Sequence, residues 1–114
     1  MADLSYVRGT TYSMTFNYTP PEGAANGATA LFSVKTELDN DITDTTNEIM
    51  APKNVAMTDN SCVITIDPSD VSMSHDPARN YVWDIKVLDS EGNIYPAVSG
   101  KFKLDVTATN RITA

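Results

Sequence analysis

Alternation of apolar and polar residues with a period of two is the dominant pattern along this chain. In residues 81–88 one face carries Tyr81, Trp83, Ile85 and Val87. Residues 101–106 repeat the pattern with Phe102, Leu104 and Val106, and the turn-forming residues 90–93 lie between the two segments. A period of two with one apolar face is typical of half-buried antiparallel strands. Residues 81–106 are therefore predicted to form a long β-hairpin.

The same pattern predicts further short strands at residues 4–7, 11–18, 29–38, 48–50, 55–57 and 62–66. Their expected inward residues are Tyr12, Met14, Phe16, Tyr18, Ala30, Phe32, Val34, Cys62, Ile64 and Ile66. Prolines at 20 and 21 end the second strand, because proline cannot donate to a strand ladder. Asp59 and Asn60 tolerate positive φ and favour a hairpin that joins residues 55–57 to 62–66. Residues 68–73 are expected to form one helical turn.

About seven short strands separated by turns at regular spacing predict a two-sheet antiparallel sandwich. The chain has 114 residues, which suits one domain over residues 1–114. Residues 1–7 are expected to be a short N-terminal arm, and residues 107–114 a polar C-terminal tail.

Charge and cysteine content narrow the possible partners. The net charge is −7 at a pI of about 4.4, which disfavours nucleic acid and anionic membranes. A single cysteine, Cys62, excludes a disulfide within the chain. The first residues lack the basic start and apolar run of a secretory signal, and no apolar run has the length of a membrane span.

Two sets of residues have the types that hydrolysis or zinc binding requires. Ser74, His75 and Asp76 are the residue types of a catalytic triad, but neighbours on a loop rarely place the base between its partners. His75 and Cys62 are the only residues of their types, whereas structural zinc uses four ligands. We therefore expect no catalytic residues and no metal site here, and expect Cys62 to be a core residue.

Residues 37–48 form an acidic segment with the spacing of a calcium loop. Its matching positions are Glu37, Asp39, Asp41, Thr43 and Glu48. Ile42 stands where such a loop needs glycine, and no helices are predicted on either side. A solvated loop is the favoured interpretation, with a weak cation site as the alternative.

Two aromatic residues invite a functional interpretation and are better explained by packing. Trp83 lies between Tyr81 and Ile85 on the apolar face, so we expect it at the centre of the core rather than stacked on a ligand. Tyr81 begins its strand just after a loop that contains Pro77. Its placement is like the tyrosine corner of immunoglobulin-type sandwiches, in which the hydroxyl bonds back to the loop.

Several segments in a fixed order resemble a known family. They are VRGTTY at 7–12, ALFSVK at 30–35, ITIDPSD at 64–70, YVWDI at 81–85, DSEG at 89–92, GKF at 100–102 and DVT at 105–107. Together they resemble the small immunoglobulin-like domains of tailed-bacteriophage virions, of the type at the N-terminus of the phage baseplate upper protein. Two departures are Thr10, where the family motif has aspartate, and the end at Ala114, where baseplate proteins continue. The resemblance thus implies an immunoglobulin-like sandwich used as a stand-alone module.

The resemblance also implies a structural role in a virion, without catalysis or a cofactor. The expected partners are other virion proteins and further copies of this chain, with the tail or baseplate as the location and synthesis in the host cytoplasm. The two terminal segments are the expected docking arms. Alternatives are a capsid-surface or neck protein, or a module that binds a carbohydrate or host receptor through residues 22–27 and 39–44.

Overall fold

The computed structural model describes residues 3–35, 49–50, 52–71 and 80–105. This part of the chain forms seven β-strands and contains no helix. The strands are β1 (Leu4–Val7), β2 (Tyr12–Asn17), β3 (Gly27–Lys35), β4 (Lys53–Ala56), β5 (Ser61–Ile66), β6 (Asn80–Asp89) and β7 (Ile94–Asp105). The all-β prediction is confirmed.

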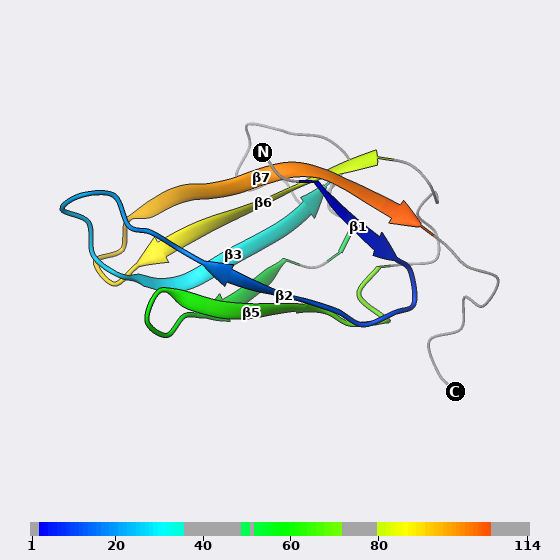
Figure 1. Ribbon diagram of the computed structural model, residues 1–114, viewed down its shortest axis with the longest axis horizontal. Coiled ribbons are helices and arrows are strands. Elements are labelled where there is room, and N and C mark those ends of the chain that lie inside the picture. The colour runs from blue at the N-terminus through cyan, green and yellow to red at the C-terminus, as the bar shows by residue number, and fades with distance from the viewer. Residues whose placement is uncertain (1–2, 36–48, 51, 72–79, 106–114) are drawn as a thin grey trace.

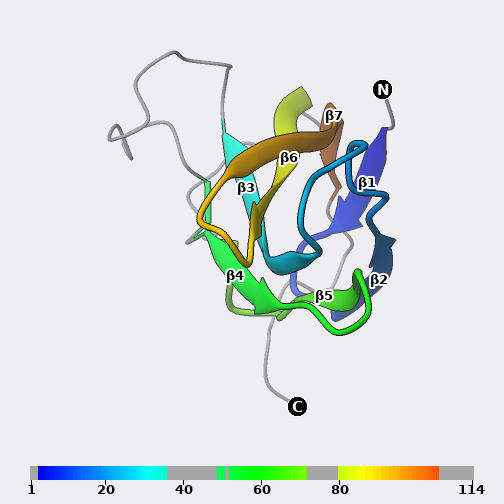
Figure 2. The same cartoon turned by 90° about the vertical axis from the view of Figure 1, so that its left-hand side faces the viewer.

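The strands form two sheets. Five make a sheet in the order β1-β7-β6-β3-β4, while β2 and β5 pair with each other (Figure 1). Viewed from the end, the larger sheet curls like half of a barrel, with β2 and β5 on its open side (Figure 2). All neighbours are antiparallel except β1 and β7, which run parallel. The expectation of a purely antiparallel sandwich was therefore wrong at β1.

The predicted hairpin is confirmed as β6 and β7. Gly92 has a φ of +87°, and the backbone N–H of Asp89 donates to the carbonyl of Asn93 at 2.9 Å. The register slips once, where Ile85 faces Val98 and Lys86 faces Pro96. Ala97 is thus the extra residue of a β-bulge.

The core forms where the predicted inward faces meet. Ala30, Phe32 and Val34 of β3 are fully buried, and the same holds for Phe102 and Leu104 of β7. Trp83 is 4% exposed, and its ring centre lies 6.1 Å from that of Phe32 in a tilted arrangement. Tilted aromatic pairs add about 0.5–1.5 kcal/mol beyond their buried area. The expectation that Trp83 packs in the core is confirmed.

The predicted hairpin between residues 55–57 and 62–66 was wrong in its pairing. β4 pairs with β3, and β5 pairs with β2. The turn itself has the expected geometry, with φ of +53° at Asp59 and +61° at Asn60, closed by hydrogen bonds between Thr58 and Ser61. β4 and β5 belong to opposite sheets and pack apolar side chains against one core, so the turn between them connects the two sheets.

Two smaller predictions also need correction. Ile49 and Met50 form a buried bend instead of a strand, with the Ile49 N–H donating to the Val34 carbonyl at 3.0 Å. The strand lies beyond Pro52, at β4. Residues 68–71 form a turn instead of a helical turn, and residues 72 and 73 lie outside the described part. The Asp70 N–H donates to the Asp67 carbonyl at 3.0 Å, and the Asp70 carboxylate accepts the Asp67 N–H at 2.6 Å.

The N-terminal arm is corrected as well. Its described part enters the sheet as β1, with Leu4 opposite Phe102 and Val7 opposite Asp105. Tyr6 of β1 is 1% exposed, so burial of its ring holds this segment in the core. Residues 107–114 lie outside the described part, so the docking tail stays a prediction.

Candidate functional site

A groove of about 550 Å³ lies between the free edge of β2 and the first half of β7. Met14 and Phe16 of β2 form one wall. Trp83 and Ile85 of β6 line it with Val98 of β7. Every residue that lines the groove in the described part of the chain is uncharged. Such a surface suits an apolar or neutral partner.

The strands explain why the groove is there. β1 has only four residues and covers β7 from Phe102 to Asp105. Pro96 and the bulge at Ala97 interrupt the remaining half of β7. Because proline lacks an N–H and a bulge increases local twist, this half is a poor pairing partner for β2. The two sheets therefore stay open along this side.

Tyr18 and Asp89 bury polar atoms near one end of the molecule. The Tyr18 hydroxyl, at the end of the groove, has no hydrogen-bond partner in the structure, and neither has the Oδ2 atom of Asp89. The Oδ1 atom of Asp89 accepts the N–H groups of Glu91 and Asn93, both at 2.9 Å. Burial raises the pKa of Tyr18, and the nearby Tyr95 and Asp89 raise it further. The Tyr18 hydroxyl therefore stays protonated at neutral pH, and it is buried rather than open to the groove.

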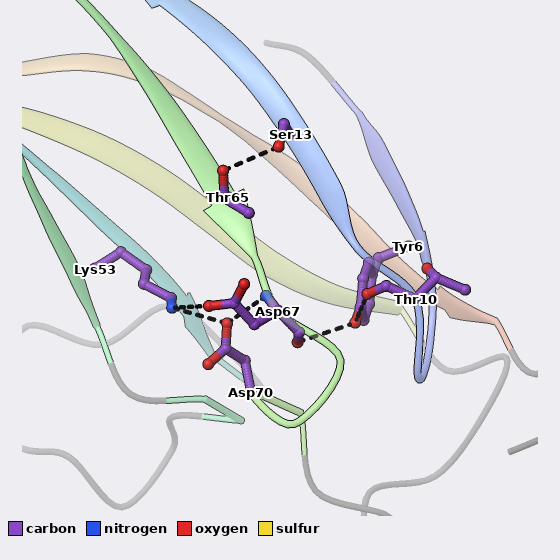
Figure 3. Close-up of polar contacts among 7 residues, drawn as sticks. All are labelled: Tyr6, Thr10, Ser13, Lys53, Thr65, Asp67 and Asp70. Atoms are coloured by element: carbon purple, nitrogen blue, oxygen red, sulfur yellow. Dashed lines mark hydrogen bonds and ion pairs between the residues drawn. The ribbon is translucent and has the colours of Figure 1, made fainter. Parts of the chain in front are cut away.

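A second polar cluster, on the opposite side of the two-stranded sheet, is fully paired. The Lys53 ammonium contacts Asp70 at 2.8 Å and Asp67 at 3.5 Å (Figure 3). The hydrogen bond that the Lys53 ammonium donates to Asp70 raises the pKa of Lys53. This cluster fastens β4 to the turn after β5, so its carboxylates are engaged in structure.

The same view shows how the β1–β2 turn is fastened. The Tyr6 hydroxyl donates to the Thr10 carbonyl at 2.6 Å and lies 3.4 Å from the Asp67 carbonyl (Figure 3). On the outer face, the hydroxyls of Ser13 and Thr65 are 2.9 Å apart. These contacts tie β1, β2 and β5 together.

The candidate catalytic and metal residues are mostly outside the described part of the chain. This applies to Ser74, His75 and Asp76, and to the whole acidic segment from residue 37 to residue 48. Cys62 is described: it is 9% exposed, lies on β5 opposite Phe16, and has a thiol pKa raised by burial. Its predicted place in the core is confirmed. Among the described residues, no three histidine, cysteine or acidic side chains gather where they could share a metal ion.

The predicted receptor-binding loops have different outcomes. Residues 39–44 lie outside the described part of the chain. Residues 22–27 are described, and the Gly27 N–H donates to Asn60 Oδ1 at 2.8 Å. A Cβ at Gly27 would come within 2.9 Å of Met57 and Val87, so this end of the loop is tightly packed. The loop to which the Tyr81 hydroxyl is expected to bond also lies outside the described residues. This tyrosine-corner hydrogen bond therefore stays a prediction.

Sequence reasoning identified the residues of the groove only as core positions. Met14, Phe16 and Trp83 were each assigned to an inward face, but nothing local shows that two strands far apart in sequence leave a gap. Pro96 inside a strand was the available signal, because proline in a strand marks an edge or a bulge.

Comparison with protein-family models gave no match, and comparison with curated proteins gave none either. No helical segment of the described residues has the length and hydrophobicity that crossing a membrane requires. The groove and the sequence resemblance are therefore the features that bear on function.

Proposed function

We propose that this protein is a non-enzymatic structural component of a tailed-phage virion, and that it acts in the tail or baseplate as a docking module. The observation that carries the proposal is the uncharged groove beside β2. A surface lined by Met14, Phe16 and Trp83 offers contact area without a nucleophile or a titrating base. Recognition of another protein is the chemistry that such a surface serves best.

We also propose that the fold is an immunoglobulin-like sandwich, and the strand order supports this. In immunoglobulin sandwiches, strands C, F and G form one sheet, and strands A, B, E and D form the other. In this comparison β3, β6 and β7 correspond to C, F and G, with β4 as an added C′ strand, and β2 and β5 correspond to B and E. Two features depart from the arrangement: β1 lies beside β7 instead of beside β2, and no described strand corresponds to D.

Quantitative mass spectrometry of purified particles from the source phage or prophage tests the proposal. Stoichiometric peptides from this chain are expected in particles that remain after density-gradient purification. A low copy number, like that of a baseplate, neck or fibre protein, supports one of those locations, and hundreds of copies support the tail tube or the capsid surface. Complete absence from the particles overturns the proposal.

The second candidate is a module that binds carbohydrate, and the buried Tyr18 hydroxyl is the observation that favours it. The phenol lacks a hydrogen-bond partner beside an aromatic-lined groove, and it would donate to a sugar hydroxyl only if a bound sugar moved the side chains that bury it. Trp83 is the only tryptophan of the chain and lines this groove, so its fluorescence reports binding. A saturable emission change with host cell-wall sugars, lost in Tyr18→Phe, would favour this candidate over a scaffold.

A further inference from the structure

β2 is an open strand edge without the usual protection against pairing. On one side it pairs with β5, and none of the described strands lies on its other side. Its six residues, YSMTFN, contain no charge and no proline, and its register with β5 is continuous from Tyr12 to Asn17. Natural sheets protect their edges with charges, prolines, bulges or short strands. β2 has none of these.

The other described edges carry such protection. β1 and β4 have four residues each, and β4 carries Lys53 just after Pro52. The free half of β7 contains Pro96 and the bulge. The outer edge of β5 is not paired in a sheet, and its residues SCVITI also lack charge and proline, but β4 lies near this edge. The turn through Asp59 and Asn60 joins β4 and β5 at one end, and the ion pairs of Lys53 join them at the other. The contrast identifies β2 as the edge on which a further strand can add.

A second copy of β2 fits this edge. In an antiparallel pair, two residues that lie opposite each other point to the same face. The inward residues of β2 have even numbers, so they stay on one face only if each lies opposite an even-numbered residue of the partner strand. Centred on Thr15, the pairing places Met14 opposite the partner's Phe16 and Ser13 opposite the partner's Asn17. Sulfur then meets an aromatic ring on the inner face, polar residues meet on the outer face, and no like charges oppose each other.

We propose that β2 pairs antiparallel with β2 of a second copy about Thr15, which joins two two-stranded sheets into one of four strands. The inference rests on the proposed role as an assembly module and names its self-contact. One strand edge is a small interface of the weak class, so free copies should pair measurably only at high protein concentration, and a particle in which other contacts hold the copies close should favour the contact further. Each copy has a net charge of −7, and none of the charged residues lies on β2. Two copies therefore repel each other, so added salt should screen the repulsion and strengthen the pairing.

Site-directed disulfide formation tests the pairing and its register. In a Cys62→Ala background, where the introduced thiol is the only one, Thr15→Cys lies opposite itself. Opposed Cα atoms in antiparallel strands are about 4.5–5.5 Å apart, within the range of a disulfide. With a mild oxidant, the full-length Thr15→Cys protein is expected to form a covalent dimer at least tenfold faster than the control.

The matched control is Ser13→Cys, which is exposed on the same face of the same strand. In the proposed register two Ser13 positions are about 14 Å apart along the strands and cannot join. Ser13→Cys mixed with Asn17→Cys is instead expected to form mixed dimers quickly. Equal rates for Thr15→Cys and Ser13→Cys, or no dimer with Thr15→Cys, overturn the proposal. Fast linkage of Thr15→Cys to Ser13→Cys overturns this register.

Sedimentation of the chain with its native cysteine gives a second test. Thr15→Lys places two positive charges opposite each other and is expected to abolish the concentration-dependent rise in mass. Val63→Lys adds the same charge on β5, opposite Thr15 within the molecule, at a side chain that is 55% exposed. It is expected to leave association intact, and a chain that stays monomeric at every concentration overturns the proposal.

These results separate the two proposals. Presence in particles without the Thr15→Cys dimer removes the β2 contact and keeps the virion role. A Thr15→Cys dimer of a chain that is absent from particles keeps the β2 contact and removes the virion role.

Discussion

The two halves of β7 belong to one strand and have opposite surroundings. Residues 102–105 are covered by β1, and Phe102 and Leu104 there are fully buried. No second strand of the described chain covers residues 94–99, which contain Pro96 and the bulge at Ala97 and border the groove. The difference shows that four residues of β1 decide where the larger sheet ends.

The two buried tyrosine hydroxyls differ between the halves. At the covered half, the Tyr6 hydroxyl donates to the Thr10 carbonyl at 2.6 Å. At the open half, the Tyr18 hydroxyl is buried without a hydrogen-bond partner. An unsatisfied buried polar group costs about 1–3 kcal/mol. Of the two tyrosines, the one in the open half therefore bears this cost.

The largest expected difference is between core truncations in the two halves. Phe102→Ala should lower the free energy of unfolding by about 3–5 kcal/mol, because it removes a fully buried ring. Val98→Ala removes two half-exposed methyl groups and should cost about 1 kcal/mol. Urea denaturation followed by circular dichroism measures both. Similar losses would contradict the contrast between the halves.

Removing a hydroxyl should have opposite effects at the two tyrosines. Tyr6→Phe loses a 2.6 Å hydrogen bond to the Thr10 carbonyl and should cost about 1 kcal/mol. Tyr18→Phe removes a buried hydroxyl without a partner, so it should be neutral or stabilising. The thermal unfolding midpoints of the two variants measure this difference, and a loss with Tyr18→Phe would show that its hydroxyl is hydrogen-bonded after all.

The pH dependence of stability should reveal Asp84, which faces Ser99 in the open half. Burial raises its carboxyl pKa above the ordinary 3.8, against the opposing effect of Lys86 and Lys35. The folded state then binds the carboxyl proton of Asp84 more tightly than the unfolded state does. The contribution of Asp84 to stability therefore falls as the pH rises from the unfolded-state pKa through the higher folded-state pKa. Asp84→Asn should therefore raise the unfolding midpoint at pH 7.

The control for Asp84 is the same pair of proteins at pH 3, where the carboxyl is protonated in both states. The midpoints of Asp84→Asn and the unaltered protein should converge there. A gap that is independent of pH would assign the effect to packing instead of charge.

The smallest effect concerns the thiol of Cys62, on the sheet that borders the groove. Its burial and raised pKa should make its reaction with a disulfide reagent at pH 8 slow compared with the chain in urea. A rate above that of global unfolding would mean that the two-stranded sheet opens by itself. A rate equal to that of the unfolded chain would contradict the burial of Cys62.

Local patterns predicted the strands, and long-range geometry decided what they pair with. The alternation around Trp83 and Phe102 predicts β6 and β7, because a period of two can be recognised from residues that are close together in the sequence. The pairing of β4 with β3 depends on which side of the core each strand approaches, and Asp59 and Asn60 are compatible with both outcomes. The groove could not be predicted, because it forms between β2 and β7, which only the folded chain brings near each other.

The parallel arrangement of β1 and β7 has a mechanical consequence. Leu4 lies beside Phe102 and Val7 beside Asp105, so the first strand enters the sheet at one end of this ladder and the last strand leaves it at the other. Tension applied through the two ends of the described chain would pull these neighbours past each other along their length. Their hydrogen bonds would then carry the load together, in shear, instead of opening one after another. The fold is thus arranged to transmit a pulling force along β7.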